Sequence, residues 1–146
     1  MVFQTFAFLA VLALATCNDE HLGNIPQRTF SAEELAQYDG SDPEKPIYMA
    51  VKGVVFDVTK GREFYGKEGT YNVMAGKDPS HAIAKWSLEV DDIHDNIDSL
   101  SSEQKAELDK IFRDVYQAKY PVVGRTEKYA YFRERDDAAA DRRADL

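Results

Sequence analysis

Residues 47–71, IYMAVKGVVFDVTKGREFYGKEGTY, contain the clearest structural pattern in the sequence. Two short apolar runs, 47–51 and 54–58, alternate in the way that is typical of β-strands. Between them lies Lys52-Gly53, and a glycine in a two-residue connection indicates a hairpin turn. The sequence therefore predicts a β-hairpin, followed by a loop rich in glycine and aromatic residues.

Helix-start signatures lie on both sides of this hairpin. Each pairs a capping side chain with a favourable residue in the first turn: Ser31 with Glu34, Asp78 with Pro79, and Ser101 with Gln104. The last signature precedes apolar residues at helical spacing: Leu108, Ile111, Phe112 and Val115. They predict a helix of about five turns that Pro121 ends. Helices that pack on a small sheet, without a repeated strand–helix–strand order, predict an α+β domain.

Composition limits the size and the partners of this domain. With 146 residues, of which 44% are hydrophobic, the chain can form one domain with a single core. The formal net charge is −8, whereas proteins that bind nucleic acid concentrate lysine and arginine on their surface. We therefore expect neither nucleic acid nor an anionic membrane as a partner.

The two ends of the chain differ from its middle. Residues 1–17 contain no charged side chain, and their apolar run ends in Ala13 and Ala15, a pattern typical of a cleaved secretory signal peptide. A retained anchor is the alternative. Cys17 is the only cysteine and lies beside the expected cleavage site, so we expect no disulfide.

Residues 129–146, at the other end of the chain, carry charges of both signs, and we expect a mobile tail there.

Two further patterns resemble chemical sites but lack a necessary residue. Residues 61–67, GREFYGK, match part of a phosphate-binding P-loop, but Glu68 stands where serine or threonine would hold magnesium. Residues 91–98 contain four aspartates and His94, but they lack the glycine and terminal glutamate of a calcium-binding loop. A solvent-exposed acidic loop explains residues 91–98 better than a calcium site does. Since no Gly-x-Ser-x-Gly nucleophile motif occurs either, we expect a protein that is not an enzyme.

The glycine-rich loop carries the strongest candidates for binding. Tyr65 and Tyr71 lie beside Gly66 and Gly69, whose backbone can bend close to a flat ligand. The residues alone leave two interpretations open. The tyrosine rings either line a ligand pocket or pack on the hairpin as part of the core.

Segments 30–42, 47–80 and 118–124 together resemble the membrane-associated progesterone receptor family, a branch of the cytochrome b5-like haem and steroid-binding domains. The resemblance covers about residues 28–128, and the apolar leader is most similar to that of a secreted member. It implies a small mixed sheet with helical pairs that form a haem cleft. The His-Pro-Gly-Gly loop of ordinary cytochrome b5 is absent, and FYGKEG stands in its place.

The resemblance also implies the residues of a haem site. Tyr71 matches the single axial ligand of ferric haem b, and a phenol of ordinary pKa about 10 ionises readily beside ferric iron. Four further positions match residues that contact the ligand or close its pocket: Tyr65, Asp78, Lys119 and Tyr120. His81 stands where relatives commonly have arginine, which removes a permanent charge near the cleft.

From the resemblance we expect a secreted, non-enzymatic haem-binding protein with growth-factor-like signalling through an unidentified cell-surface receptor. A steroid or another small hydrophobic molecule is a second expected ligand, and an open haem face would permit a haem-mediated dimer. Two alternatives stay open. One is an accessory protein of the endoplasmic reticulum lumen that regulates or supplies an oxidoreductase, since the terminal RADL resembles a retrieval signal. The other is an interaction module without haem.

Overall fold

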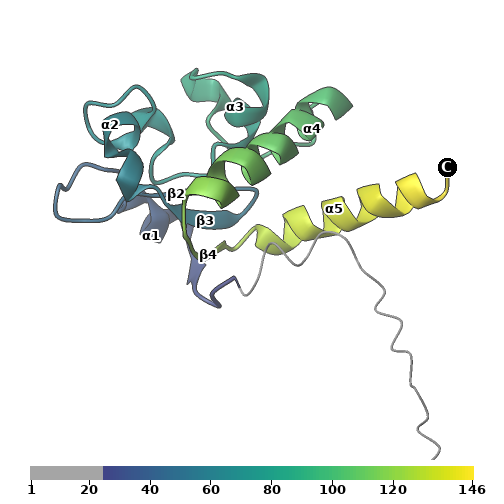
Figure 1. Ribbon diagram of the computed structural model, residues 1–146, viewed down its shortest axis with the longest axis horizontal. Coiled ribbons are helices and arrows are strands. Elements are labelled where there is room, and N and C mark those ends of the chain that lie inside the picture. The colour runs from purple at the N-terminus through teal and green to yellow at the C-terminus, as the bar shows by residue number, and fades with distance from the viewer. Residues whose placement is uncertain (1–24) are drawn as a thin grey trace, which may run out of the picture.

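A four-stranded mixed sheet forms the centre of the computed structural model, which describes residues 25–146 (Figure 1). The strands are β1 (Thr29–Phe30), β2 (Tyr48–Val51), β3 (Val54–Asp57) and β4 (Val122–Thr126). Their order is β1-β4-β3-β2, with β1 parallel to β4 and the other neighbours antiparallel. The predicted α+β class with a small mixed sheet is confirmed. The expected signal peptide at 1–17, with Cys17, lies outside the described residues.

Strands β2 and β3 form the predicted hairpin. Its two turn residues, Lys52 and Gly53, have φ angles of 50° and 75°, the left-handed conformation that a tight hairpin turn requires. A Cβ atom added at Gly53 would lie 2.7 Å from the Cα atom of Tyr129. Glycine at this position therefore serves both the turn and the close approach of the C-terminal part of the chain.

Five α-helices lie around the sheet in the described part of the chain: α1 (Ala32–Ala36), α2 (Arg62–Tyr65), α3 (Ser80–Lys85), α4 (Ser102–Ile111) and α5 (Tyr129–Ala144). Helices α2, α3 and α4 gather over one face, and α1 lies toward the other (Figure 1). The cap predictions at Ser31 and Ser101 are confirmed, because each hydroxyl accepts a hydrogen bond from the third residue after it. A π-helical segment, Phe112–Gln117, continues α4 and was not predicted.

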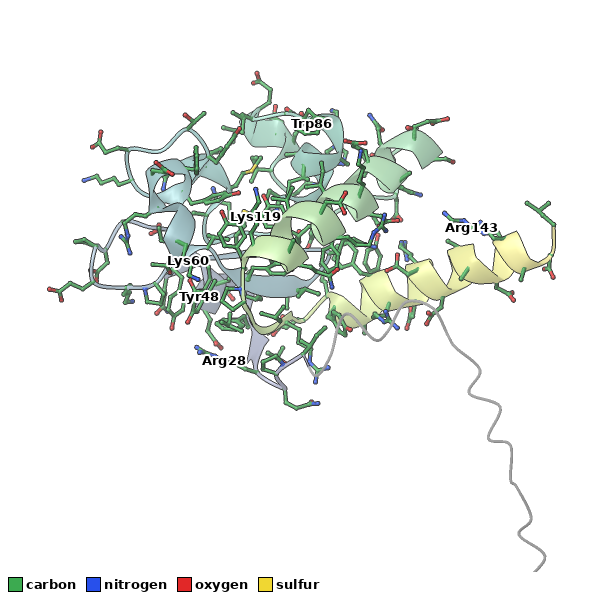
Figure 2. The ribbon with its side chains drawn as sticks, in the orientation of Figure 1. Arg28, Tyr48, Lys60, Trp86, Lys119 and Arg143 are labelled. Carbon is green, nitrogen blue, oxygen red and sulfur yellow. The ribbon has the colours of Figure 1, made fainter. Side chains whose placement is uncertain are left out.

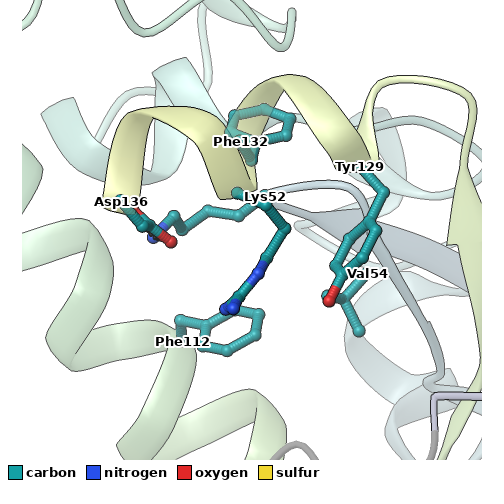
Figure 3. Close-up of a pocket in the computed structure, with 7 residues that line it drawn as sticks. Lys52, Val54, Phe112, Tyr129, Phe132 and Asp136 are labelled. Carbon is teal, nitrogen blue, oxygen red and sulfur yellow. Dashed lines mark hydrogen bonds and ion pairs between the residues drawn. The ribbon is translucent and has the colours of Figure 1, made fainter. Parts of the chain in front are cut away.

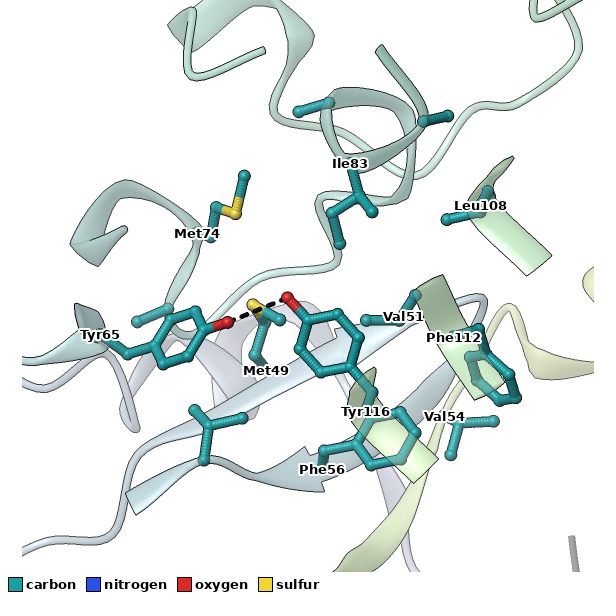
Figure 4. Close-up of a cluster of buried hydrophobic side chains, with 14 of the residues drawn as sticks. Met49, Val51, Val54, Phe56, Tyr65, Met74, Ile83, Leu108, Phe112 and Tyr116 are labelled. Atoms are coloured by element: carbon teal, nitrogen blue, oxygen red, sulfur yellow. Dashed lines mark hydrogen bonds between the residues drawn. The ribbon is translucent and has the colours of Figure 1, made fainter. Parts of the chain in front are cut away.

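Side chains of the hairpin alternate between two cores. Met49, Val51, Val54 and Phe56 belong to the larger core, which the helices α2, α3 and α4 cover (Figure 4). Ala50 and Val55 point the other way and pack with Phe30 and Leu35 beside α1. This alternation follows from the period of two along a strand, and it fixes the register of the hairpin.

Helix α5 occupies the segment where a mobile tail was expected. Phe132 is only 1% exposed, and it lines a small pocket together with Val54 of the hairpin and Phe112 on the opposite side (Figure 3). The Nζ atom of Lys52 lies 2.9 Å from a carboxylate oxygen of Asp136 and 2.7 Å from one of Asp109 in α4. These contacts anchor the first half of α5, and the alanines that follow favour a helix. The second half projects away from the sheet, with Arg143 near its end (Figure 2).

The sequence did not predict the strands β1 and β4. Strand β1 has only two residues, and β4 follows Pro121 directly with a single buried residue, Gly124. Neither is long or apolar enough to show an alternating pattern. Among residues 25–146, no helix has the length and apolar character needed to cross a lipid bilayer.

Candidate functional site

A cavity of about 320 Å³ opens beside the glycine-rich loop, within the range of small-molecule sites. The loop contributes Tyr65, Tyr71 and Met74 to its wall. The opposite sides come from α3 with the residues after it, and from α4 with the π-helical segment. Their largest side chains at the cavity are Ile83, Trp86, Leu88, Ile111, Val115 and Tyr116.

Backbone contacts hold the glycine-rich loop in shape. The N–H group of Tyr71 donates to the carbonyl oxygen of Phe64 at 2.8 Å, and a Cβ atom at Gly69 would lie 2.1 Å from that same oxygen. The side-chain amide of Asn72 donates to the carbonyl oxygens of Asp39 and Tyr65, both at 3.0 Å. Because the loop is fastened at these points, Tyr65 and Tyr71 are presented to the cavity in a fixed arrangement.

Tyr65 and Tyr116 meet at the inner wall of the cavity. Their side chains are almost fully buried, and their hydroxyl oxygens are 3.0 Å apart in a hydrogen bond (Figure 4). Burial is the main cause that raises the pKa of both phenols. Both phenols therefore stay protonated at neutral pH, and either hydroxyl can donate the hydrogen bond between them.

Tyr71 differs from this pair in its exposure. It is 40% exposed and stands at the rim, with its ring centroid 6.0 Å from that of Tyr65 and 6.1 Å from that of Phe64. The structure thus brings together the two loop tyrosines that the sequence analysis selected. One lies at the inner wall of the cavity, and the other lies at its entrance, where solvent reaches the phenol.

Tyr120 and Lys119 lie at the end of the long helical segment. The ring of Tyr120 contacts the ring of Tyr65 edge to face, with centroids 6.4 Å apart, so it packs against a lining residue without lining the cavity itself. The side chain of Lys119 is exposed (Figure 2). Of this pair, only the tyrosine is connected with the cavity by a described contact.

Asp78 lies away from the cavity lining and joins the hairpin to α3. One carboxylate oxygen accepts a hydrogen bond from the N–H of Gly53 at 2.9 Å, and the other accepts from the N–H of Ser80 at 3.1 Å. Burial raises the pKa of this carboxyl group to about 6. The prediction of Asp78 as the cap residue is wrong by one position, because α3 begins at Ser80 and Pro79, which has no side chain that can accept a hydrogen bond, occupies the cap position. Asp78 still accepts from the N–H of Ser80 at the start of the helix.

The acidic segment packs against α3 through histidines. The buried ring of His81 stacks on His94 with centroids 4.2 Å apart, and its Nδ1 atom lies 2.8 Å from the carbonyl oxygen of Asn96. Its Nε2 atom lies 3.5 Å from a carboxylate oxygen of Asp92, which also contacts Lys85. In the part of the chain that the structure describes, no three histidine, cysteine, aspartate or glutamate side chains converge to hold a metal ion.

The sequence did not predict most of the cavity lining, and two of the unpredicted residues are aromatic: Tyr116 and Trp86. Tyr116 follows Phe112 by four residues, and this helical spacing could have placed its hydroxyl on the apolar face. Trp86 ends α3 in the left-handed conformation with φ 53°, uncommon for a bulky residue, and its ring is 76% exposed at the cavity entrance. Such a conformation has no signal in the sequence.

Comparison with protein families identifies residues 31–127 as a match to the model described as "Cytochrome b5-like Heme/Steroid binding domain". Among curated proteins, the chain is 47% identical over 96 residues to "Probable steroid-binding protein 3" of Arabidopsis thaliana, covering 66% of this chain and 95% of that protein. It is 46% identical over 111 residues to "Membrane steroid-binding protein 2" of rice, Oryza sativa subsp. japonica, covering 76% of this chain and 41% of that protein.

A mammalian relative and a solved structure agree with these matches. Human "Membrane-associated progesterone receptor component 2" is 41% identical over 106 residues, covering 71% of this chain and 47% of that protein. The chain thus spans less than half of the rice and human relatives. A solved hypothetical protein of Arabidopsis thaliana, described as having a cytochrome b5 like fold, has a TM-score of 0.62 and 45% identity, covering 68% of this chain and 91% of that one.

Proposed function

The chain belongs to the family of cytochrome b5-like haem/steroid-binding domains, and on this basis we propose that it is a secreted, non-enzymatic protein that binds haem b. Tyr71 is the proposed axial ligand of the ferric iron. Within the membrane-associated progesterone receptor branch, we assign the chain to the secreted type represented by neudesin. The observation that carries the proposal is the position of the Tyr71 phenol, at the solvent-accessible edge of an apolar cavity.

The residues around the cavity fit a flat, largely apolar ligand such as haem. Ile83, Ile111 and Val115 supply aliphatic surface, and Trp86 and Leu88 at the entrance are 76% and 41% exposed. Exposed apolar side chains grouped at a cavity entrance are typical of a binding site. A bound ring system would cover them and gain free energy from the apolar area removed from water.

The individual tyrosines have different parts in this proposal. When bound, ferric haem supplies a strong positive charge beside which a phenol loses its proton, and phenolate ligation favours the ferric state. Tyr71 provides the oxygen ligand. Tyr65 and Tyr116 keep their protons and hold the inner wall. Tyr120 packs against Tyr65, while Lys119 and Asp78 are proposed contacts from the family resemblance alone.

A haem titration of purified residues 18–146 tests this assignment. We expect saturable one-to-one binding with the visible absorption of a ferric phenolate complex. Tyr71→Phe should remove that absorption and weaken binding about tenfold or more, whereas Tyr65→Phe should keep the absorption. Tyr48→Phe is the matched control, because Tyr48 packs in the smaller core on the opposite face of the sheet. An unchanged spectrum in Tyr71→Phe, or no saturable binding to the wild type, would reject the proposed ligand.

A second ligand class is supported by the apolar character of the cavity. Several relatives carry steroid-binding in their names, and a rigid small hydrophobic molecule fits a lining dominated by aliphatic and aromatic side chains. We propose that such a molecule competes with haem for this cavity. Displacement of a bound steroid by haem in an equilibrium competition would support one shared site, and simultaneous binding would contradict it.

The biological setting remains a proposal drawn from the family resemblance. We propose that the loaded protein acts outside the cell on an unidentified receptor, in the manner of a neurotrophic factor, and that two haem-loaded copies can associate. The rival proposals are a haem-dependent accessory protein of the endoplasmic reticulum lumen and a haem-free interaction module. Recovery of the processed chain from culture medium would favour secretion, while retention inside cells would favour the accessory protein.

A further inference from the structure

We propose that the Tyr65–Tyr116 hydroxyl pair is a polar recognition point for a neutral, rigid apolar ligand that carries one hydrogen-bond acceptor, such as a ketone oxygen. The inference rests on the part of the proposed function that makes this cavity a ligand site. It adds the direction in which such a ligand lies, with its acceptor at the inner wall and its apolar end toward Trp86 and Leu88 at the entrance.

The position of the pair supports this assignment. Tyr65 and Tyr116 are 6% and 5% exposed, whereas the entrance residues Tyr71 and Trp86 are 40% and 76% exposed. Figure 4 shows the two hydroxyl groups pointing toward each other, with Met74 and Ile83 across from them. Both tyrosines line the cavity, and they are its two buried phenols within a lining that is otherwise mostly apolar.

The Tyr65–Tyr116 pair has one O–H donor more than its mutual hydrogen bond uses. Each phenol has one O–H donor, and the two hydroxyls share one hydrogen bond of 3.0 Å. One donor is used in that bond, and the donor of the second hydroxyl has no described acceptor. A buried donor without an acceptor costs free energy, so an acceptor on a ligand would stabilise the complex. The pair is therefore prepared to donate one hydrogen bond into the cavity.

The charge of the surroundings selects a neutral acceptor. Among the described residues, those that line the cavity are apolar, aromatic or hydroxyl-bearing, and none is charged. A carboxylate placed at the inner wall would lose its hydration without gaining a cation as partner. A ketone or ether oxygen has a much smaller desolvation cost and accepts a phenol donor well. The geometry thus favours a neutral oxygen over an acid.

Fluorenone and fluorene test the proposal, because they have nearly the same flat shape and differ in one carbonyl oxygen. Binding of each to the haem-free chain is measured by quenching of the protein's tryptophan fluorescence, and Trp86 is the only tryptophan. The measured quantity is the ratio of the two affinities within one protein. The double variant Tyr65→Phe/Tyr116→Phe removes both hydroxyls, and Tyr48→Phe removes one hydroxyl outside the cavity.

We expect the fluorenone preference to fall roughly fivefold in the double variant, the effect of one neutral hydrogen bond, while its affinity for fluorene is retained. Retained fluorene binding shows that the variant is folded with an intact cavity. Tyr48→Phe should keep the wild-type ratio. An equal ratio in the wild type and the double variant would overturn the proposal. If the wild type binds haem but neither fluorenone nor fluorene, the recognition point is rejected while the haem proposal stands.

Discussion

Asp78, a proposed ligand contact from the family resemblance, also has a structural role in this chain. Its carboxylate connects the backbone of Gly53 in the hairpin turn with the first turn of α3. It accepts these hydrogen bonds in a buried position, and burial outweighs them in setting the direction of the pKa change. Since α3 forms one wall of the cavity, Asp78 contributes to the site through the placement of that helix.

The raised pKa of Asp78 predicts a pH dependence of stability. Its value of about 6 in the folded protein lies above the ordinary 3.8, so the folded state binds the proton more tightly than the unfolded state. The stabilising contribution is therefore complete below about pH 4 and is lost as pH rises through 6, by about 3 kcal/mol in total. Urea unfolding of the wild type and Asp78→Asn between pH 4 and 7 measures the difference. A difference that does not change with pH would contradict the prediction.

The long helical element shows how a regular sequence pattern acquires a local irregularity. Ser101 and Gln104 form a complete capping box that starts α4, and the helix then continues into the π-helical segment Phe112–Gln117. A π-helical turn is wider than an α-helical turn and shifts the direction of the side chains after it. Val115 and Tyr116 in this segment both reach the cavity. The irregular part of the element is thus the part that lines the site.

The capping box predicts a difference between two neighbouring serines. Ser101→Ala removes the hydroxyl that accepts from the N–H of Gln104, and we expect a loss of about 1 kcal/mol in the free energy of unfolding. Ser102→Ala is the matched control, because Ser102 is exposed in the first turn and alanine favours a helix. Chemical denaturation measures both. Equal effects of the two substitutions would show that the cap does not stabilise α4.

At the scale of the whole molecule, α5 joins parts that are distant in sequence. Lys52 of the hairpin turn forms ion pairs with Asp109 in α4 and Asp136 in α5, and its own side chain is only 10% exposed. Phe132 adds an apolar contact to the larger core. The packed structure therefore extends beyond residue 128, to at least Asp136. The final ten residues are mostly exposed and add little to the core.

The first half of α5 is expected to contribute much more to stability than the second half. Phe132→Ala should lower the free energy of unfolding by about 3 kcal/mol or more, because it leaves a cavity in the larger core. Removal of residues 137–146 should change it by less than about 0.5 kcal/mol. Urea denaturation of the two variants measures both effects. The prediction would be wrong if the truncation lowered the free energy of unfolding strongly, or if Phe132→Ala left it unchanged.

The local elements and the family could be predicted from the amino-acid sequence. Alternation around Lys52-Gly53 specified the hairpin because strand side chains have a period of two, and the cap signatures at Ser31 and Ser101 specified two helices because their hydrogen bonds are local. The separated motifs also led to the two loop tyrosines. Each of these features is encoded by residues that lie close together in the chain, or by short motifs that can be read without the fold.

The long-range contacts and the shape of the site could not be predicted without the folded chain. Strand β4 depends on pairing with β1 and β3, and the first half of α5 depends on Lys52 and Phe132, which no local pattern encodes. The pairing of Tyr65 with Tyr116, and the place of Asp78 outside the cavity, likewise require segments far apart in sequence to be folded together. Burial and donor–acceptor distances arise from that packing, so the chemistry of the inner wall could be derived only from the folded chain.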